Sequence, residues 1–493
     1  MKNSIKFIAL ALVFVLCVGL AACTTNGGNN ETPISNEVYE GNVIYVGNTA
    51  GTTGSLATIG VPFNLGINAA FHEYNQNGGF NGKTVALKHY DDKGTATNSV
   101  PLMEKLILED EVFAVVGNYG GYAVNVNLNT LKKHRVPMIY AAAGVDALYN
   151  DNATSAGDRC IFPVQPLNMT EGRSLIVRAF ARAVEDDTLP VDQWVMTGGL
   201  GATKVGVIAN QDEASQGILN GIKLEADTLP ASKKANIVYQ NVSGSDFNAA
   251  AVSIVSNGCD TVILTVTGAS FTAALTALSR AGFEGNVLTS YNNASPAVLN
   301  DSNNNLTENG LDIMSKMTIY AQGWLDTSST TYVYNKDTTL FKAYKLLNAS
   351  YANGVPGFTE AYWVAAEAIF SYAQTVDPSI AFTMSYNSYA LAGYIAGNLF
   401  CNALEELEKS GKPLTRANLV DIMESVELQV AMADKISYAG GARTGVESFS
   451  AAFFYDTADK TIMGDLATSN HAAASAPLSG LQTIDDLRKL ITE

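Results

Sequence analysis

Basic residues, histidines and cysteines are all scarce in this 493-residue sequence. Lys and Arg number 30 against 47 Asp and Glu, which gives a formal net charge of −17. Because a surface that binds nucleic acid would be basic, this balance argues against nucleic acid as a partner. The four histidines form no HExxH motif and are spread along the chain as His72, His89, His134 and His471. We therefore expect no metal site and no cofactor.

The cysteines cannot all form internal disulfides. Cys17 and Cys23 lie in the N-terminal segment, and Cys160, Cys259 and Cys401 lie in the rest of the chain. The latter three are an odd number, and their spacing does not suit zinc. We expect them to be buried as small hydrophobic residues, and their bonding state stays open.

Long apolar runs are rare as well. Residues 7–22 form one uncharged apolar run, preceded by Lys2 and Lys6. This run is shorter than the roughly 20 residues of a bilayer span and is typical of a secretory signal peptide. It ends in Leu20-Ala21-Ala22-Cys23, which resembles a bacterial lipobox. That resemblance implies export, cleavage before Cys23 and a lipid on this cysteine. An ordinary signal peptide with an incidental cysteine and an uncleaved anchor are the alternatives.

The rest of the chain predicts a tether followed by two domains. Residues 24–36 are polar, rich in Asn and Gly, and without periodicity, which indicates a flexible tether. The remainder is too long for one typical hydrophobic core. No second apolar run of spanning length follows residue 22.

Strands and helices alternate after the tether. Residues 43–46 form a short apolar strand, Gly51 to Gly60 form a loop, and a helix with Pro62 in its first turn runs to Asn77. The expected elements that follow are a strand at 84–90, a helix at 97–109, a strand at 112–116, a helix at 122–134 and a strand at 136–140. This order predicts a parallel, doubly wound sheet.

The same pattern restarts after about residue 200. The expected elements are a strand at 204–209, a helix at 215–227, a strand at 236–241, a helix at 246–257, a strand at 260–266, a helix at 270–281 and a strand at 286–290. The chain therefore predicts two α/β lobes of similar plan. Because ligands bind at the carboxyl ends of such strands, two facing lobes would form a ligand cleft.

Several motifs occur together in a characteristic order. They are Gly51-Thr52-Thr53-Gly54-Ser55 with Gly60, Asn77-Gly78-Gly79-Phe80-Asn81-Gly82-Lys83, Tyr90-Asp91-Asp92-Lys93, Val112-Phe113-Ala114-Val115-Val116-Gly117, Arg135-Val136-Pro137-Met138-Ile139, Ser388-Tyr389-Ala390-Leu391-Ala392-Gly393-Tyr394 and Leu414-Thr415-Arg416-Ala417-Asn418-Leu419. Over roughly residues 42–465 the chain resembles type I periplasmic binding proteins. Within them it is most similar to the leucine/isoleucine/valine-binding-like subfamily of ABC importers.

The resemblance implies an α/β fold of two doubly wound, Rossmann-like lobes with parallel central sheets, which close on a small ligand. By analogy, three chain crossings fall near Pro163–Pro166, near Tyr320–Gly323 and between about 425 and 450. The expected parts are a lipoprotein signal peptide (1–22), a tether (23–41), lobe 1 (42–164), lobe 2 (165–321), a return to lobe 1 with a helical insertion (322–430), and a return to lobe 2 with a C-terminal segment (431–493). The family's late lobe-1 helix matches Tyr389–Lys409, and the extra helical stretch Phe358–Gln374 before it has no assigned role.

In this family, one lobe holds a ligand carboxylate with backbone N–H groups and hydroxyls at helix N-termini. The matching loops here are residues 119–122 and 141–144. The hydroxyls usual in relatives are missing at Gly121 and Gly144, but glycine lets a ligand approach the backbone closely. We expect backbone donors at Gly121 and Ala142 to remain available, and ordinary strand-to-helix turns are the alternative.

The second lobe lacks the acid that amino-acid binders place against the ligand ammonium. The matching position falls on Tyr291, which Asn292 follows, and an aromatic position of relatives falls on Ala214. A buried ammonium needs a paired charge, so this pattern disfavours a plain α-amino acid as the ligand. Asp212 or Glu213 could substitute for the missing acid, or both could be solvated loop residues.

Four tyrosines map near the expected cleft, although a single tyrosine in such a place more often packs in a hinge or core than contacts a ligand. Together they favour a ligand with some flat or apolar surface. The complete set of expected ligand-binding residues is Ser55, Tyr119, Gly120, Gly121, Tyr122, Ala142, Ala143, Gly144, Ala214, Ser270, Tyr291, Asn292 and Tyr386.

The resemblance implies an extracellular solute-binding lipoprotein of an ABC importer. It would capture a small polar metabolite, an amino-acid-like compound or a related carboxylate or amide, and deliver it to the transmembrane permease subunits. It would work in the cell envelope, lipid-anchored through Cys23 to the outer face of the cytoplasmic membrane or in the periplasm. A ligand-sensing lipoprotein of a signalling system is the alternative.

Catalysis is not expected. The sequence has no GxSxG and no HExxH motif, and Gly198-Gly199-Leu200-Gly201 lacks the Lys-Ser/Thr of a Walker loop. Asp91 and Asp92 are neighbours on a strand and so point to opposite faces, which favours a turn or hinge network over acid–base chemistry.

Overall fold

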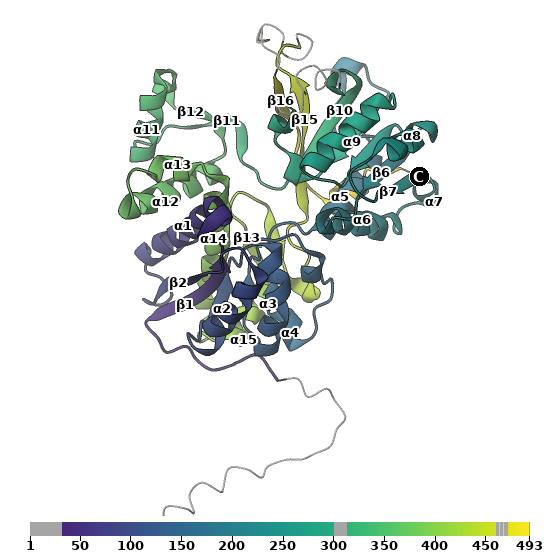
Figure 1. Cartoon of the computed structure of the whole chain (residues 1–493). Helices are drawn as coiled ribbons and strands as arrows, with labels where there is room; N and C mark the ends of the chain where they lie inside the picture. Colours follow the sequence, from purple (N-terminus) through teal and green to yellow (C-terminus); the bar gives the residue numbers. More distant parts are fainter. Residues whose placement is uncertain (1–31, 300–312, 460–462, 464–466, 468–471, 493) are drawn as a thin grey trace, which may run out of the picture. The chain divides into compact units, whose positions relative to one another are not determined.

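The computed structural model describes residues 32–299, 313–459, 463, 467 and 472–492. The chain divides into two compact units, Met1–Pro33 and Ile34–Glu493, and the second contains all of the helices and strands named below (Figure 1). The expected signal peptide and Cys23 lie outside the described residues. In the described residues, no helix is both long enough and apolar enough to span a bilayer.

The first lobe is built on a five-stranded parallel sheet in the order β2-β1-β3-β4-β5. Strands β3, β4 and β5 are buried throughout and β1 is largely buried, as parallel strands covered by helices require, whereas the edge strand β2 is mostly only partly buried. The strands are β1 (Val43–Ala50), β2 (Thr84–Asp91), β3 (Ala114–Val116), β4 (Met138–Ile139) and β5 (Ile161–Phe162). The helices between them are α1 (Ala57–Gln76), α2 (Ala96–Leu108), α3 (Gly121–His134) and α4 (Ala156–Arg159).

The second lobe repeats this plan and adds two strands. Its parallel strands run in the order β7-β6-β8-β9-β10, and β15 and β16 extend the sheet in antiparallel fashion beyond β10. The strands are β6 (Val205–Ala209), β7 (Ile237–Asn241), β8 (Thr261–Leu264), β9 (Gly285–Thr289), β10 (Met317–Gly323), β15 (Ser448–Asp456) and β16 (Ala473–Thr483). The helices are α5 (Asn168–Phe180), α6 (Glu213–Ala226), α7 (Ala231–Lys234), α8 (Asn248–Ser256), α9 (Ala269–Arg280) and α17 (Ile484–Arg488).

The predicted fold class, two doubly wound parallel sheets, is confirmed. The antiparallel strands β15 and β16 were not predicted, and one expectation about the first helix is wrong. Helix α1 begins at Ala57, so Pro62 lies beyond the first turn and Gly60 lies inside the helix instead of the loop. Glycine is needed at position 60 because the helix passes close to the chain after β1: a Cβ on Gly60 would lie only 2.2 Å from the carbonyl oxygen of Gly51.

One helix pair in each lobe is in backbone contact through glycines. In lobe 1, a Cβ on Gly66 of α1 would lie 1.9 Å from the carbonyl oxygen of Ala390, on the facing helix α14 (Ser388–Lys409). In lobe 2, a Cβ on Gly172 of α5 would lie 2.0 Å from the carbonyl oxygen of Ile218 on α6. These approaches fix α14 against α1, and α5 against α6, without room for a larger residue.

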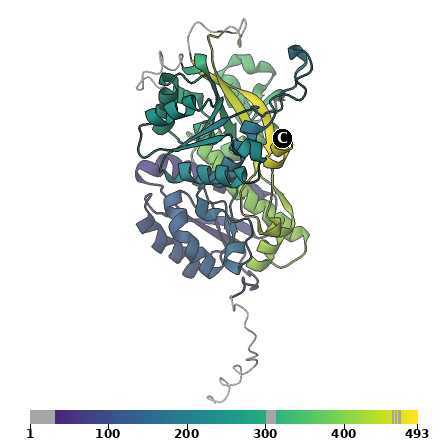
Figure 2. The same cartoon turned by 90° about the vertical axis from the view of Figure 1, so that its right-hand side faces the viewer.

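The chain passes between the two sheets three times. It leaves β5 and enters α5, leaves β10 at Gly323, and returns from β14 (Lys435–Ser437) to β15. The first and third passages run side by side, since the main-chain N–H of Val446 donates to the carbonyl of Val164 at 2.8 Å. Figure 2 shows the same elements from a second direction.

The stretch between the second passage and the third contains more than the expected extra helix. It includes the two-stranded sheet of β11 (Ser328–Tyr334) and β12 (Val355–Phe358), together with an aromatic cluster in which Tyr334 stacks on Trp363 with ring centroids 4.3 Å apart. Its other elements are α11 (Thr339–Leu347), α12 (Glu360–Val376), α13 (Ala381–Ser385), α14, α15 (Arg416–Ser425), β13 (Glu427–Gln429) and β14. Helix α12 accounts for most of the predicted stretch 358–374.

Candidate ligand-binding site

Buried polar side chains fill the carboxyl ends of the lobe 1 strands. Asn48 and Thr49 near the end of β1 have no exposed surface. Asn48 Nδ2 donates to Asn64 Oδ1 at 2.8 Å, and Thr49 Oγ1 donates to Asn118 Oδ1 at 2.9 Å. These bonds tie β1 to α1 and to the loop after β3, so the strand-end loops rest on a fixed base.

The two aspartates at the end of β2 form the predicted turn network. Asp91 accepts the main-chain N–H of Thr52 at 2.9 Å, and Asp92 accepts the hydroxyl of Tyr122 at 2.9 Å. Burial alone would raise the pKa of Asp91, but hydrogen bonds from Thr53 and Thr52 outweigh it and lower the pKa to about 2. Both carboxylates are thus engaged in structure, and Asp92 holds the Tyr122 side chain in place.

The N-terminus of α3 offers free backbone donors. Gly120 caps the helix with φ of 91°, a conformation that favours glycine. The first helical N–H groups that bond to this cap belong to Ala123 and Val124, at 3.0 Å each. Among the described residues, the N–H groups of Gly121 and Tyr122 have no acceptor, so this end of the helix can bind an anion or a carbonyl.

The N-terminus of α9 repeats this arrangement in the second lobe. Gly268 caps the helix with φ of 58°, and its carbonyl accepts from Phe271 and Thr272. The N–H groups of Ala269 and Ser270 have no acceptor in the described part of the chain. Because β3 and β8 occupy equivalent positions in the two sheets, each lobe presents one open helix N-terminus at the point where the strand order reverses.

The loop after β4 corrects one prediction. The main-chain N–H of Ala142 donates to the carbonyl of Asn118 at 2.9 Å, so the expectation of a free donor at Ala142 is wrong. A parallel bridge between Tyr119 and Ala142 continues the sheet beyond β3 and β4 and uses this group. Ala143 is buried, and the carbonyl of Gly144 accepts the N–H of Asn168. This loop therefore supports the site with few free donors of its own.

A buried carboxylate lies behind the loop after β9. Glu171 of α5 has no exposed surface, and its oxygens accept the Ser290 hydroxyl at 2.9 Å and the Tyr291 N–H at 2.7 Å. Burial raises the pKa of Glu171 to about 7 despite these bonds. Sequence reasoning missed this residue, because its partners lie more than a hundred positions away in the chain. Tyr291, which stands where relatives have an acid, is thus hydrogen-bonded to a buried acid, and each oxygen of that acid already accepts one hydrogen bond.

Asp212 and Glu213, which could replace the missing acid as partner of a ligand ammonium, already accept hydrogen bonds from protein side chains. Asp212 is exposed at the N-cap of α6, where it accepts from Asn210 Nδ2 at 2.6 Å. Glu213 accepts from Asn125 Nδ2 of α3 at 3.0 Å, a hydrogen bond between helices of the two lobes. Ala214 follows as the second residue of α6 and is partly buried, beside its buried neighbour Ser215.

Tyr119 and Tyr291 are partly buried in the strand-end loops, whereas Tyr386 lies outside these loops. Tyr119 packs on Phe63 at 5.5 Å, and its pKa is raised by burial and by the nearby Tyr389, a residue that the sequence reasoning did not include. Tyr291 is partly buried, with its hydroxyl 3.4 Å from the carbonyl oxygen of Pro166 in the first passage. Tyr386 is 47% exposed and packs on Phe382, outside the strand-end loops.

Two further expected residues are exposed. Ser55 lies in the short turn between β1 and α1, and Asn292 lies directly after Tyr291. The main-chain N–H of Asn292 donates to the Ser290 hydroxyl at 3.1 Å. Strand-end loops of the two lobes therefore carry most of the expected residues, and the lobe 2 loop is ordered by Ser290.

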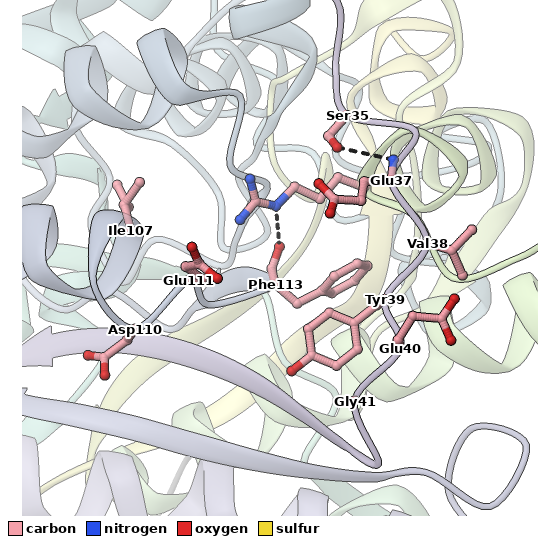
Figure 3. A pocket seen from close by; sticks show the side chains of 11 residues that line it. Ser35, Glu37, Val38, Tyr39, Glu40, Gly41, Ile107, Asp110, Glu111 and Phe113 are labelled. Carbon is pink, nitrogen blue, oxygen red and sulfur yellow. Dashed lines mark hydrogen bonds between the residues drawn. The ribbon is translucent and has the colours of Figure 1, made fainter. Parts of the chain in front are cut away.

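Five cavities in the described part of the chain lie elsewhere, and none of the five is lined by an expected ligand-binding residue. One, of about 600 Å³, lies at the opposite, amino end of the lobe 1 strands (Figure 3). It is lined by Glu37, Glu40, Asp110 and Glu111, and by Arg416, which donates to the carbonyl of Phe113 at 2.9 Å. Its acidic lining does not suit an anionic ligand.

Among the described residues, no group of three or more His, Cys, Asp or Glu side chains could hold a metal ion. Cys160, Cys259 and Cys401 are buried, as predicted, and they are free thiols. Burial raises the pKa of the Cys160 thiol to about 12, so it is not a reactive thiolate at neutral pH.

The chain matches a known family over more than half of its length. The family model described as a periplasmic binding protein matches residues 43–338. An amino acid binding protein of Pseudomonas aeruginosa is 24% identical over 212 residues, which are 43% of this chain and 50% of that protein. The chain thus spans about half the length of this curated relative.

Two solved structures share the fold. A putative branched-chain amino acid ABC transporter from Silicibacter pomeroyi has a TM-score of 0.55 and 13% identity, with 83% of this chain and 92% of that chain covered. A fatty acid ABC transporter substrate-binding protein from Thermomonospora curvata has a TM-score of 0.51 and 16% identity, with 90% and 93% covered.

Two doubly wound lobes, each with an open helix N-terminus at its strand ends, fit the family model described as a periplasmic binding protein. This chain belongs to the periplasmic binding protein family.

Proposed function

We propose that this chain is the extracellular solute-binding lipoprotein of an ABC importer, anchored to the membrane through a lipid on Cys23. It captures a small ligand between two lobes and delivers it to the permease. On this proposal, lobe 1 comprises residues 42–164 and 322–430, and lobe 2 comprises 165–321 and 431–493. The protein works at the cell envelope, on the outer face of the cytoplasmic membrane or in the periplasm.

The observation that carries this proposal is the matched pair of helix N-termini. Gly121 and Tyr122 on α3, and Ala269 and Ser270 on α9, each supply an N–H group without an acceptor in the described part of the chain. The helix dipole adds partial positive charge at each of these ends. An acceptor group on a ligand, such as a carboxylate or a carbonyl, satisfies these donors, and chain crossings allow the two lobes to approach it.

The chemistry of the loops restricts the ligand further. Asp212 and Glu213, which were considered as partners for a ligand ammonium, and the buried Glu171 already accept hydrogen bonds from protein groups. Tyr119 and Tyr291 supply flat, partly apolar surface with a polar tip. We propose a ligand with one acceptor group and an uncharged or aromatic body. The names of the relatives mention amino acids and fatty acids, two classes of compound that share a carboxylate.

A thermal-shift screen tests the proposal. The purified protein is heated with a panel of amino acids, aromatic and aliphatic carboxylates, and amides. A ligand present at 100 times its dissociation constant adds about 2.7 kcal/mol to the free energy of unfolding, which gives a clear rise in melting temperature. We expect hits among compounds with a carboxylate or an amide and an uncharged body. A panel without any hit would contradict the proposal.

A further inference from the structure

The first turns of α5 contact each passage between the sheets. The N–H of Asn168 donates to the carbonyl of Gly144 in lobe 1 at 2.8 Å. The hydroxyl of Thr170 donates to the carbonyl of Thr444 in the third passage, and Ser174 accepts from Gln322 of β10 at 2.8 Å. The N-terminal end of α5 therefore continues the first passage and is hydrogen-bonded to the second passage, the third passage and the loop after β4.

Glu171 lies in this first part of α5 and is hydrogen-bonded to the lobe 2 loop that follows β9. Its carboxylate oxygens accept the hydroxyl of Ser290 and the main-chain N–H of Tyr291, at 2.9 and 2.7 Å. Close packing of Gly172 against Ile218 fixes the helix at this point, so the carboxylate cannot follow the loop if the loop moves. The loop after β9 is thus bound to the hinge through one side chain.

Both partners of Glu171 can only donate in this geometry. The N–H of Tyr291 is a donor without acceptor capacity. The hydroxyl oxygen of Ser290 already accepts the N–H and the side-chain amide of Asn292, at 3.1 Å each, so both of its lone pairs are used. A proton on either oxygen of Glu171 turns that oxygen into a hydroxyl, which is a weaker acceptor, so the hydrogen bond that this oxygen receives from Ser290 or Tyr291 is weakened. The ionised carboxylate therefore holds the observed loop conformation more strongly than the protonated acid does.

Within the described residues, no cation compensates this buried charge. Arg173 and Arg178, the basic neighbours on α5, bond to Glu225 and Glu447 and to the main-chain carbonyls of Gly198 and Phe449, respectively. From β10, Gln322 contributes an amide, and from the third passage Thr444 contributes a carbonyl. The phenol of Tyr291 in the β9 loop interacts with the carboxylate, and Tyr140 of lobe 1 interacts with that phenol. Burial accordingly raises the pKa of Glu171 to about 7.

We propose that Glu171 is a positioning residue whose protonation releases the Ser290–Asn292 loop and so weakens ligand capture as the pH falls below neutral. The link to capture rests on the proposed function, in which this loop is part of the ligand site. The link between protonation and the loop stands on the contacts of Glu171 alone. The two links are tested separately.

Hydrogen exchange measures the first link without any ligand. Deuterium uptake of the peptide that spans residues 288–294 is followed by mass spectrometry between pH 6 and pH 8, and corrected for the intrinsic exchange rate at each pH. We expect protection of this peptide in the wild type to fall about tenfold from pH 8 to pH 6, because the protonated fraction rises across this range. In Glu171→Gln the protection is constant with pH. Equal protection of the wild-type peptide at both pH values overturns the proposal.

Two further variants separate protonation from a general loss of structure. Glu284→Gln removes the same charge from an exposed residue beside β9, and it keeps the wild-type pH profile. Ser290→Ala removes one hydrogen bond to the carboxylate, so the midpoint of its profile moves to higher pH. If Glu171→Gln does not fold, the wild-type profile and the direction of the Ser290→Ala shift decide; an unchanged midpoint in Ser290→Ala overturns the proposal.

The second link uses the same thermal-shift panel of amino acids, carboxylates and amides, run at pH 6 and pH 8. Compounds that stabilise the wild type at pH 8 stabilise it less at pH 6, whereas Glu171→Gln responds equally at both. A pH-dependent loop with pH-independent hits overturns coupling to capture. A panel without hits counts against the proposed function, and the exchange result is unaffected by it.

Discussion

The carboxylate of Glu171 accepts the main-chain N–H of Tyr291 at 2.7 Å, although the two residues lie 120 positions apart in the chain. This bond joins the helix that follows the first passage between sheets to the loop that carries two expected ligand-binding residues. The carboxylate is fully buried, and its neighbours in the described part of the chain bring no positive charge, so the bond links the protonation of one side chain to the shape of the site.

The first prediction concerns stability against pH. The pKa of Glu171 is raised from its ordinary 4.5 to about 7 in the folded protein, so the folded state holds the proton more tightly than the unfolded chain. Its contribution to stability is therefore present below pH 4.5 and is lost as the pH rises to about 7, by roughly 3 kcal/mol in total. Urea unfolding of the wild type and Glu171→Gln at pH 5 and pH 8 measures it. A difference between the two proteins that does not change with pH would contradict this.

The second prediction concerns the anchor. Cys23→Ser abolishes lipidation and releases the protein from the membrane, since the lipid is the membrane attachment that the sequence predicts. Metabolic labelling with palmitate and cell fractionation measure this. Cys259→Ser, which changes a buried thiol, keeps the label. Wild-type protein that carries no label would rule out the anchor.

The third prediction concerns closure. Ligand binding draws the lobes together about the three passages, as hinge closure does in two-domain binding proteins. Small-angle X-ray scattering with a saturating hit from the screen gives a smaller radius of gyration than without it, while a non-binding panel compound changes nothing. An unchanged radius at saturation would indicate a rigid site or a site outside the cleft.

The fourth prediction concerns selectivity. Leucine, isoleucine and valine bind weakly or not at all, because the acids near the site are engaged and Tyr291 occupies the position of the ammonium partner. For a ligand that does bind, Tyr291→Ala costs roughly 1–3 kcal/mol through lost packing and a lost hydrogen bond. Tyr291→Phe keeps the packing and loses only the hydrogen bond, so it weakens binding less than Tyr291→Ala does. A micromolar dissociation constant for free leucine by calorimetry, which is a binding free energy of about −8 kcal/mol, would refute this.

Sequence patterns predicted the parallel core well, because it is encoded locally. Each expected strand and helix between residues 84 and 290 has a counterpart, such as α8 at Asn248–Ser256 for the expected helix at 246–257. Apolar runs, glycine turns and helical periodicity are properties of adjacent residues. Strand β16 escaped prediction because it is an edge strand of small and polar residues with Pro477 inside it, so it lacks the alternation of a half-buried strand.

The site was less predictable, because its parts meet only in three dimensions. The free N–H of Gly121 was expected, but the N–H of Ala142 is used by a bridge whose extent no local pattern reveals. Glu171 carries no signal in the sequence, since an acid in an amphipathic helix is ordinarily solvated. Its role follows from α5 being buried on all sides between α6, the sheet and the passages.

Calorimetry on two glycine variants tests the central claim most directly, the claim that the open N-terminus of α3 binds the ligand. A Cβ on Gly121 would lie 3.2 Å from Val145, beside the free donors, whereas a Cβ on Gly480 of β16 would meet nothing within 4 Å. With the best hit from the screen, Gly121→Val should lose at least about 1.4 kcal/mol, a tenfold loss of affinity, and Gly480→Val should bind as the wild type does. Equal affinity of Gly121→Val and the wild type would contradict a ligand site at this helix.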